Sequence, residues 1–272
     1  MNTAPLLFDR TALTAHRARA TSDAMFLHQT ALDEVQDRIS LVNRAFKSLA
    51  VVTPFPDLWT KAFPKAVIVP DDDTLALPTN SFDLVIHAMC LHWANDPVGQ
   101  MIQCRRALFE DGLFLGVLLG GQTLNELRSA LSEAESKVTG GLSPRVAPMG
   151  DIRDLGALLQ RAGLALPVAD GNVLTAEYRD LQHLMHDLRA MGETNVMSAR
   201  LRHPTKRKVF TTASDIYATR FSNNAGRIPA TFDIITLTGW APSDSQPKPL
   251  RPGSAQARLA DVLGAPETKL PD

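Results

Sequence analysis

The chain of 272 residues has only two cysteines and none of the short motifs that mark a metal site or a nucleophile. Cys90 and Cys104 match no metal spacing, and no Cys-x-x-Cys, H-E-x-x-H or Ser–His–Asp nucleophile motif is present. We therefore expect two reduced, buried thiols, no metal site and no catalytic side chain.

Long apolar runs are missing too. No stretch approaches the roughly 20 apolar residues that are needed to span a bilayer. The opening "MNTAPLLFDR" also lacks the apolar stretch of a secretory signal. We expect a protein that does not insert into a membrane and that is located in the cytoplasm.

A strong net charge of either sign is absent. The chain carries 28 Lys and Arg against 29 Asp and Glu, a formal net charge of -1. This balance gives no reason to expect nucleic acid as a partner. The basic residues do gather in one place, which comprises Arg200, Arg202, His203, Lys206, Arg207 and Lys208. We interpret this cluster as a solvated helix start, and an acidic partner is the alternative.

Phosphate-binding glycine loops are also absent. The glycine pairs Gly120-Gly121 and Gly140-Gly141 do not open a helix through a G-x-G-x-x-G spacing. Because glycine has no Cβ, such pairs let the backbone turn tightly or come close to a ligand.

What the chain does contain is an alternation of strand and helix patterns. Residues 82–88 and 113–119 are typical of strands, and the helix pattern at 97–112 between them gives the crossover that parallel strands need. The alternation predicts an α/β fold with a mostly parallel sheet and late helices that cover it. Further strands are predicted at 66–69, 172–178 and 232–240, and further helices at 151–163, 180–191 and 205–221.

The composition also changes along the chain. No proline or glycine lies between Leu6 and Thr53, and apolar residues at helical spacing follow one another there. The end of the chain is rich in proline. We therefore divide the chain into an N-terminal helical segment (1–47), an α/β domain (48–240) and a C-terminal tail (241–272).

An acidic turn is the most informative local feature. Asp71 and Asp72 follow a predicted strand, and His92 and Trp93 follow the next one. In doubly wound folds, ligands sit outside the carboxyl ends of the strands, so these side chains could line one crevice. The alternatives are a solvated turn, an aromatic side chain that closes the core and a histidine that satisfies a local hydrogen bond.

Several longer motifs resemble one family. "LFDRTALTAHRARA", "SFDLVIHAMCLHWANDP", "GGLSPRVAP", "LMHDLRAMGETN" and "GWAPSDSQPKPLRPGSA" are similar to the respiratory complex I assembly factor 5 family. The resemblance implies a class I S-adenosylmethionine (SAM) methyltransferase fold. The mitochondrial member is described as hydroxylating an arginine of a complex I subunit. The chain also resembles, more distantly, the malonyl-carrier-protein methyltransferase of biotin synthesis.

The stretch "LAVVTPFPDLWTKAFPKAVIVPDDD", residues 49–73, departs from that family because it contains no glycine. The family has a D-x-G-x-G-x-G type loop after its first strand, then a helix and a strand that ends in an acid for the ribose. Only 24 residues lie between Phe46 and Asp71, whereas these elements need about 45. We therefore expect a Rossmann-like sheet short of one strand. Pro54 lacks the N–H that such loops point at a ligand.

The resemblance leaves a small set of candidate cofactor contacts. They are Asp71, Asp72, His92, Trp93, Gly120 and Gly121. Our leading hypothesis is a methyltransferase-like pseudoenzyme, doubtful as a SAM binder, that acts as a binding or assembly protein for a protein partner such as a complex I subunit. The alternative is an active SAM-dependent methyltransferase or hydroxylase with a protein or carrier-bound substrate. A third hypothesis is that the crevice binds another small molecule. The oligomeric state stays open.

Overall fold

One six-stranded sheet organises the protein, in a computed structural model that describes residues 6–247. The strand order is β2-β1-β3-β4-β6-β5; β1 to β4 run parallel, and β6 is antiparallel to both β4 and β5. The predicted α/β class with a mostly parallel sheet is confirmed. The strands are β1 (Leu49–Val52), β2 (Val67–Val69), β3 (Phe82–Ala88), β4 (Leu108–Leu119), β5 (Ala165–Tyr178) and β6 (Ile228–Trp240).

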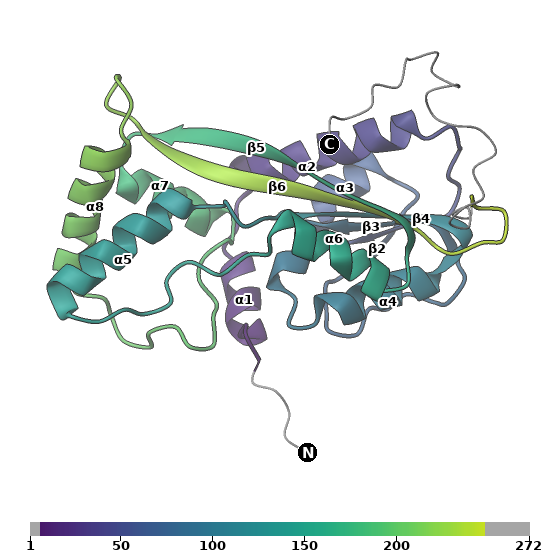
Figure 1. The fold of residues 1–272 in the computed structure, drawn as a ribbon, viewed down its shortest axis with the longest axis horizontal. Helices are drawn as coiled ribbons and strands as arrows, with labels where there is room; N and C mark the ends of the chain where they lie inside the picture. The colour runs from purple at the N-terminus through teal and green to yellow at the C-terminus, as the bar shows by residue number, and fades with distance from the viewer. Residues whose placement is uncertain (1–5, 248–272) are drawn as a thin grey trace, which may run out of the picture. The chain divides into compact units, whose positions relative to one another are not determined.

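Helices cover both faces of this sheet (Figure 1). Apolar side chains of α4 and α6 form one core with one face, and those of α2, α3, α5, α7 and α8 form a second core with the other. The helices are α1 (Arg10–Arg17), α2 (Phe26–Leu41), α3 (Pro56–Ala62), α4 (Pro97–Ala107), α5 (Asn125–Thr139), α6 (Ile152–Arg161), α7 (Leu181–Ala190) and α8 (Arg207–Phe221). Two short 3-10 turns, η1 (Ser22–Ala24) and η2 (Leu91–Trp93), complete the order.

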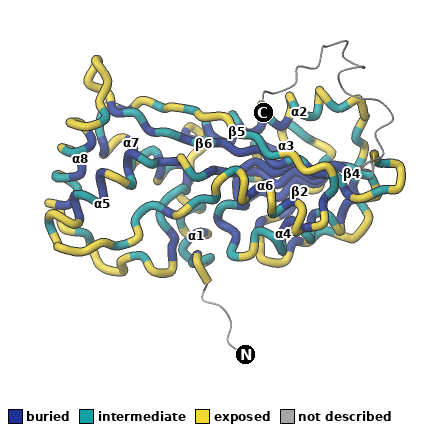
Figure 2. The backbone as a smooth tube through the Cα atoms, viewed as in Figure 1, coloured by how far each residue is buried: buried dark blue, intermediate teal, exposed yellow. Residues whose placement is uncertain are grey.

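The central strands are buried on both sides, as Figure 2 shows. Successive residues of β4 alternate between the two cores: Leu115 and Val117 face one, and Phe114 and Leu118 the other. This two-sided burial explains why the sequence of β4 is apolar throughout. The edge strand β5 is exposed along much of its length.

The glycine-free stretch at residues 49–73 forms a short strand–helix–strand unit. β1 is followed by three residues, then by the seven-residue α3, then by β2, which pairs with β1 in parallel. β2 is the edge of the sheet, and no further described strand lies beside it. The expected sheet, short of one strand, is therefore confirmed.

One helix boundary was predicted wrongly. The helix expected at 97–112 ends at Ala107, because Leu108 already pairs with Phe82 in the sheet. The chain then turns at Asp111, which has a positive φ of 57°.

The chain divides into two compact units, Met1–Pro242 and Ser243–Asp272, and the first carries every feature that follows. Residues 248–272 of the predicted tail lie outside the described residues. Within residues 6–247, no helix combines the length and the apolar composition that crossing a bilayer requires.

Candidate functional site

The carboxyl ends of the parallel strands meet at one edge of the sheet, and Asp71 lies there, two residues beyond the end of β2. Its side chain is only 7% exposed and is held by two arginines of α1. Arg17 Nη1 donates to both carboxylate oxygens at 2.8 and 2.9 Å, and Arg10 Nη1 donates to Oδ2 at 3.3 Å. Arg10 Nη2 also donates to the Asp71 carbonyl at 2.5 Å. The Asp71 carboxylate is therefore neutralised inside the chain.

Helix α1 reaches this position because both of its ends are fixed. At its start, Asp9 caps the helix by accepting from the Ala12 N–H at 3.0 Å, and this bond and Arg200 lower the pKa of Asp9 to about 2. At its end, Gly192 lies against Arg17 with a φ of +79°. A Cβ on Gly192 would lie 3.1 Å from the Arg17 Cα, so glycine allows the close approach that places Arg17.

Asp72 has a different environment from Asp71. Its side chain is 71% exposed and lies 4.0 Å from Arg10, while its carbonyl accepts from Gln100 Nε2 at 3.2 Å. Gln100 in turn bonds His87 Nε2 at 2.8 Å, and burial lowers the pKa of His87 to about 4. The acidic turn is thus held through its backbone, and the Asp72 carboxylate points to solvent.

Side chains fill the position that a glycine loop has in the family. The Phe55 N–H donates to Thr53 Oγ1 at 3.2 Å, and the His28 ring packs edge-on against Phe55 with 4.8 Å between the ring centroids. Trp59 of α3 is fully buried. Both nitrogens of His28 lack a partner among the described residues, and burial lowers the pKa of His28 to about 4.

This end of β1 offers SAM none of the loop contacts that the family resemblance implies. Pro54 and Pro56 carry no N–H, and the Phe55 N–H is already bonded. The carboxylate of Asp71 is engaged by Arg17 and Arg10. The residues present therefore do not fit the cofactor in its ordinary pose.

His92 and Trp93 lie in η2, directly after β3, and both bond a residue that the sequence analysis did not single out, Glu193. Trp93 Nε1 donates to Glu193 Oε2 at 2.7 Å, and His92 Nε2 lies 3.2 Å from the same oxygen. His92 Nδ1 accepts from the Leu119 N–H at 3.4 Å. Both predicted residues are thus engaged by this carboxylate.

Glu193 is a buried carboxylate with one oxygen left over. Its side chain is 5% exposed, and Oε1 has no hydrogen-bond partner among the described residues. Burial raises the pKa of Glu193, but His92, Arg17 and Trp93 outweigh it, so the net pKa lies below its ordinary value. An unpaired oxygen on a buried, ionised group is costly, and such atoms call for an explanation.

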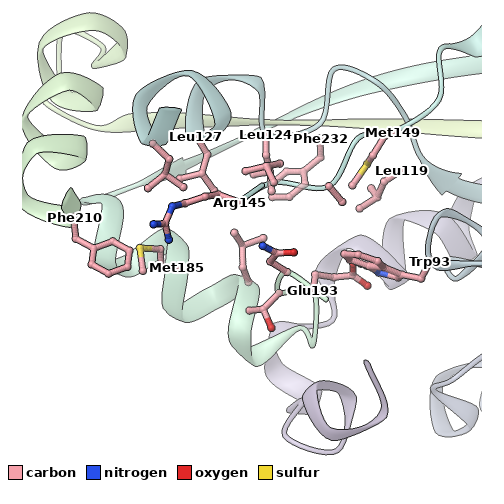
Figure 3. A pocket seen from close by; sticks show the side chains of 16 residues that line it. Trp93, Leu119, Leu124, Leu127, Arg145, Met149, Met185, Glu193, Phe210 and Phe232 are labelled. Atoms are coloured by element: carbon pink, nitrogen blue, oxygen red, sulfur yellow. The ribbon is translucent and has the colours of Figure 1, made fainter. Parts of the chain in front are cut away.

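Glu193 lines a cavity of about 220 Å³, shown in Figure 3 and called the cavity below. Its walls come from α5, α7, α8, β6, the end of β4 and η2, and most of its lining side chains are apolar. They include Trp93, Leu119, Leu124, Leu127, Met149, Met185, Phe210 and Phe232. A mostly apolar pocket with a few fixed polar groups is typical of a ligand site.

Arg145 is the other charged residue of this wall. Its Nη2 donates to Glu135 Oε1 at 2.6 Å, and its Nη1 donates to Thr205 Oγ1 at 2.8 Å. Burial of Glu135 raises its pKa, but Arg145 and Ser143 reverse the effect and lower it to about 2. The charge of Arg145 is therefore already paired. In Glu193, by contrast, only one of the two carboxylate oxygens has hydrogen-bond partners.

The glycine pair after β4 has a packing role that the structure makes visible. A Cβ on Gly120 would lie 2.2 Å from Ile235 Cδ1, while its N–H donates to the Asp233 carbonyl at 2.7 Å. A Cβ on Gly121 would meet no atom closer than the Gly150 carbonyl oxygen at 3.4 Å, which is an ordinary van der Waals contact. Close packing therefore accounts for Gly120, and a ligand contact at Gly121 stays a prediction.

The structure thus separates the predicted contacts into two groups. Trp93 lines the cavity beside Glu193, and His92 bonds Glu193 without lining the cavity itself, whereas Asp71 and Asp72 have no part in either group of contacts. Sequence reasoning missed Arg17 and Glu193; Glu193 does lie in the quoted motif "MGETN". No group of His, Cys, Asp and Glu side chains within residues 6–247 could hold a metal ion.

The fold and this edge define a class of protein. A methyltransferase domain model matches residues 51–116. A solved structure from Bacillus halodurans C-125, described as a candidate methyltransferase, aligns with a TM-score of 0.50 at 14% identity over 78% of this chain and 99% of its own. With the sheet described above, these matches define a protein of the class I, Rossmann-like methyltransferase fold.

The family follows from closer relatives. The Danio rerio protein named "Arginine-hydroxylase NDUFAF5, mitochondrial" is 35% identical over 229 residues, 84% of this chain and 69% of its own length. A malonyl-[acyl-carrier protein] O-methyltransferase of Xylella fastidiosa (strain M23) is 33% identical over 66% of this chain and 59% of its own length. The chain belongs to the arginine-hydroxylase NDUFAF5 family, the complex I assembly factor 5 family that its motifs resemble.

Proposed function

We propose that this chain is a binding or assembly protein of the family that acts in the cytoplasm without holding SAM in the ordinary pose. One observation carries the proposal: Asp71, the acid that the resemblance places near the adenine, is bonded to Arg17 at 2.8 Å and to Arg10 at 3.3 Å. The side chains of Asp71 and Arg17 are 7% and 9% exposed, so this is a buried pair.

The energetics favour the closed arrangement. Breaking a buried ion pair by removing one partner costs about 3–5 kcal/mol. A ligand with micromolar affinity gains about 8 kcal/mol in total. A cofactor that had to displace Arg17 from Asp71 would thus lose a large part of its binding free energy, and the end of β1 has no glycine-loop N–H groups to offset the loss.

The cavity, by contrast, supports the binding of a side chain of a protein partner. Glu193 brings a negative charge with an unpaired Oε1 to the wall of the cavity, and apolar side chains such as Leu127 and Met185 line the same cavity. A guanidinium on an aliphatic stem matches both features. The Danio rerio relative is named an arginine hydroxylase, so we assign an arginine side chain of a protein partner, in the first place a complex I subunit, to this cavity.

Calorimetric titration of the purified chain with SAM tests the proposal. We expect no heat of binding at SAM concentrations up to the millimolar range. A dissociation constant of that size corresponds to a binding free energy of only about -4 kcal/mol. A dissociation constant in the low micromolar range, about -8 kcal/mol, would overturn it. Native mass spectrometry of the same preparation would identify a different small molecule that co-purifies.

One observation favours a second candidate, an active SAM-dependent methyltransferase or hydroxylase of a protein or carrier-bound substrate. The cavity keeps a buried, ionised Glu193 beside Trp93 and His92, which is more than a passive surface needs. In that case SAM would bind in an altered pose through Asp71 and the Gly120-Gly121 loop, and Asp71→Ala would abolish both SAM binding and turnover. Turnover that survives the substitution would reject this pose.

A further inference from the structure

The residues that lead into α8 and form its start are rich in positive charge. Residues 200–208 contain five Lys and Arg and no acidic residue. Two of these cations are paired within the chain, since Arg200 and Arg202 contact Asp9 Oδ2 at 2.9 and 3.2 Å. Lys206, Arg207 and Lys208 are exposed and make no ion pair with any residue in the range 6–247.

These three cations lie where they weaken the helix that carries them. Lys206 is the N-cap of α8 and makes no side-chain capping bond, and the first turn contains no acidic residue. The helix dipole disfavours a positive charge at this end by about 0.3–1 kcal/mol per charge. A capping Ser or Asp would add about 1 kcal/mol. Fold stability therefore gives no reason for basic residues here, which points to contacts outside the chain.

The start of α8 is also part of the cavity. Phe210 lines the cavity, and Lys206 and Arg207 precede it by four and three residues, so they share its face of the helix. Thr205 bonds Arg145, another lining residue, at 2.8 Å. We call Lys206 and Arg207 the basic rim.

The cavity and the basic rim have opposite charge. Inside, Glu193 has a free oxygen and a side chain only 5% exposed. Outside, two cations lie about one helical turn (~5 Å) from Phe210 of the cavity wall and have no ion pair within residues 6–247. A single segment of extended chain covers this distance with about two residues.

We infer that the cavity and the basic rim form one docking surface for an extended, acidic segment of a partner protein. The segment places one cationic side chain in the cavity against Glu193 and one or two carboxylates, two or three residues away, on Lys206 and Arg207. This inference rests on the proposed function for the inserted side chain and adds the charge pattern around it. Complementary charge of both signs fixes the register of the segment and rejects partners whose flanks are basic.

Two synthetic peptides with one central arginine test this pattern. One carries glutamates two and three residues away on both sides, and the other has glutamine at those positions. Fluorescence anisotropy would be measured with the whole chain at low and high salt. We expect the glutamate peptide to bind about three- to tenfold more tightly than the glutamine peptide at low salt, and salt to remove the difference.

Matched variants separate the two halves of the surface. Lys206→Gln with Arg207→Gln should remove the preference for the glutamate peptide. Lys61→Gln with Lys65→Gln removes the same charge from two exposed sites at and just after the end of α3, and it should leave the preference unchanged. Glu193→Gln should weaken both peptides equally. The rim variant should melt no lower than the wild type, because it removes charges that oppose the helix dipole.

Each outcome decides a separate point. Equal affinity for the two peptides, or a preference that survives the rim variant, would overturn the basic rim while the arginine assignment to the cavity stands. No binding of either peptide would overturn the docking surface as a whole. Neither result touches the SAM titration, so failure here differs from failure of the proposed function.

Discussion

Two regions lie along one edge of the sheet: the carboxyl ends of β1 and β2, and the cavity at the end of β4. They differ in whether a buried carboxylate is fully paired. At the first, Asp71 is closed by Arg17 and Arg10 of α1. At the second, Glu193 is as deeply buried but keeps an unpaired oxygen. The comparison teaches that two equally buried carboxylates on one sheet edge can differ in availability, because α1 supplies arginine partners to one and leaves an oxygen of the other unpaired.

Arg17 links the two regions. It bonds Asp71 directly, and its charge contributes to the lowered pKa of Glu193. Two of its nitrogens, Nε and Nη2, have no partner in residues 6–247. A substitution of Arg17 should therefore alter both the ion pair at Asp71 and the environment of Glu193. It is the most direct test of the difference between the two regions.

Arg17→Met should have the largest effect. It leaves Asp71 buried with only Arg10 as a partner, and we expect the free energy of unfolding to fall by about 3–5 kcal/mol. Urea denaturation measures it. The control is Lys137→Met, which removes an exposed i,i+4 pair with Glu133 and should cost less than about 1 kcal/mol. Equal losses of unfolding free energy in the two variants would show that the buried Arg17–Asp71 pair stabilises the fold no more than an exposed pair does.

Gly120→Ala should have the next largest effect. The new Cβ would overlap Ile235, so the free energy of unfolding should fall by about 1–3 kcal/mol. Gly121→Ala has room and should change it by no more than about 0.5 kcal/mol. If Gly121→Ala instead weakened ligand binding with stability unchanged, the predicted ligand role of Gly121 would be supported.

His28→Phe should change the pH dependence of stability. The pKa of His28 is lowered from 6.5 to about 4 in the folded chain, so between these values the unfolded chain binds the extra proton and stability falls as the pH falls. The variant removes this pH-dependent loss of stability, which amounts to about 1–2 kcal/mol at pH 5 and nothing at pH 8. Urea titrations at both pH values measure it. An identical pH slope in wild type and variant would contradict the buried, neutral His28.

Glu193→Gln should have the smallest effect on stability and a clear effect on binding. The amide keeps an acceptor for Trp93, so we expect a change of about 1 kcal/mol or less in the free energy of unfolding. Binding of methylguanidinium, followed by NMR shifts of the cavity methyl groups, should weaken about tenfold, since a charge-assisted bond is lost. Unchanged affinity would remove Glu193 from the proposed arginine site.

Much of the fold could be predicted from the sequence because it depends on local patterns. The apolar run of β4 and the short spacing between Phe46 and Asp71 predicted a two-sided sheet that lacks one strand. The contacts that define the site could not be predicted in this way. Arg17 and Asp71 are 54 residues apart, and Trp93 and Glu193 are 100 apart, and no periodicity reports which distant side chains the fold brings together.

The three-residue connection between β1 and α3 has a consequence for the history of this lineage. A glycine loop followed by its own helix and strand differs from this connection in length as well as in residue type, so no series of point substitutions restores it. Such a loop would need an inserted block of coding sequence and a broken contact between Arg17 and Asp71. The cavity can therefore change by single substitutions, whereas the connection between β1 and α3 cannot gain a glycine loop in this way.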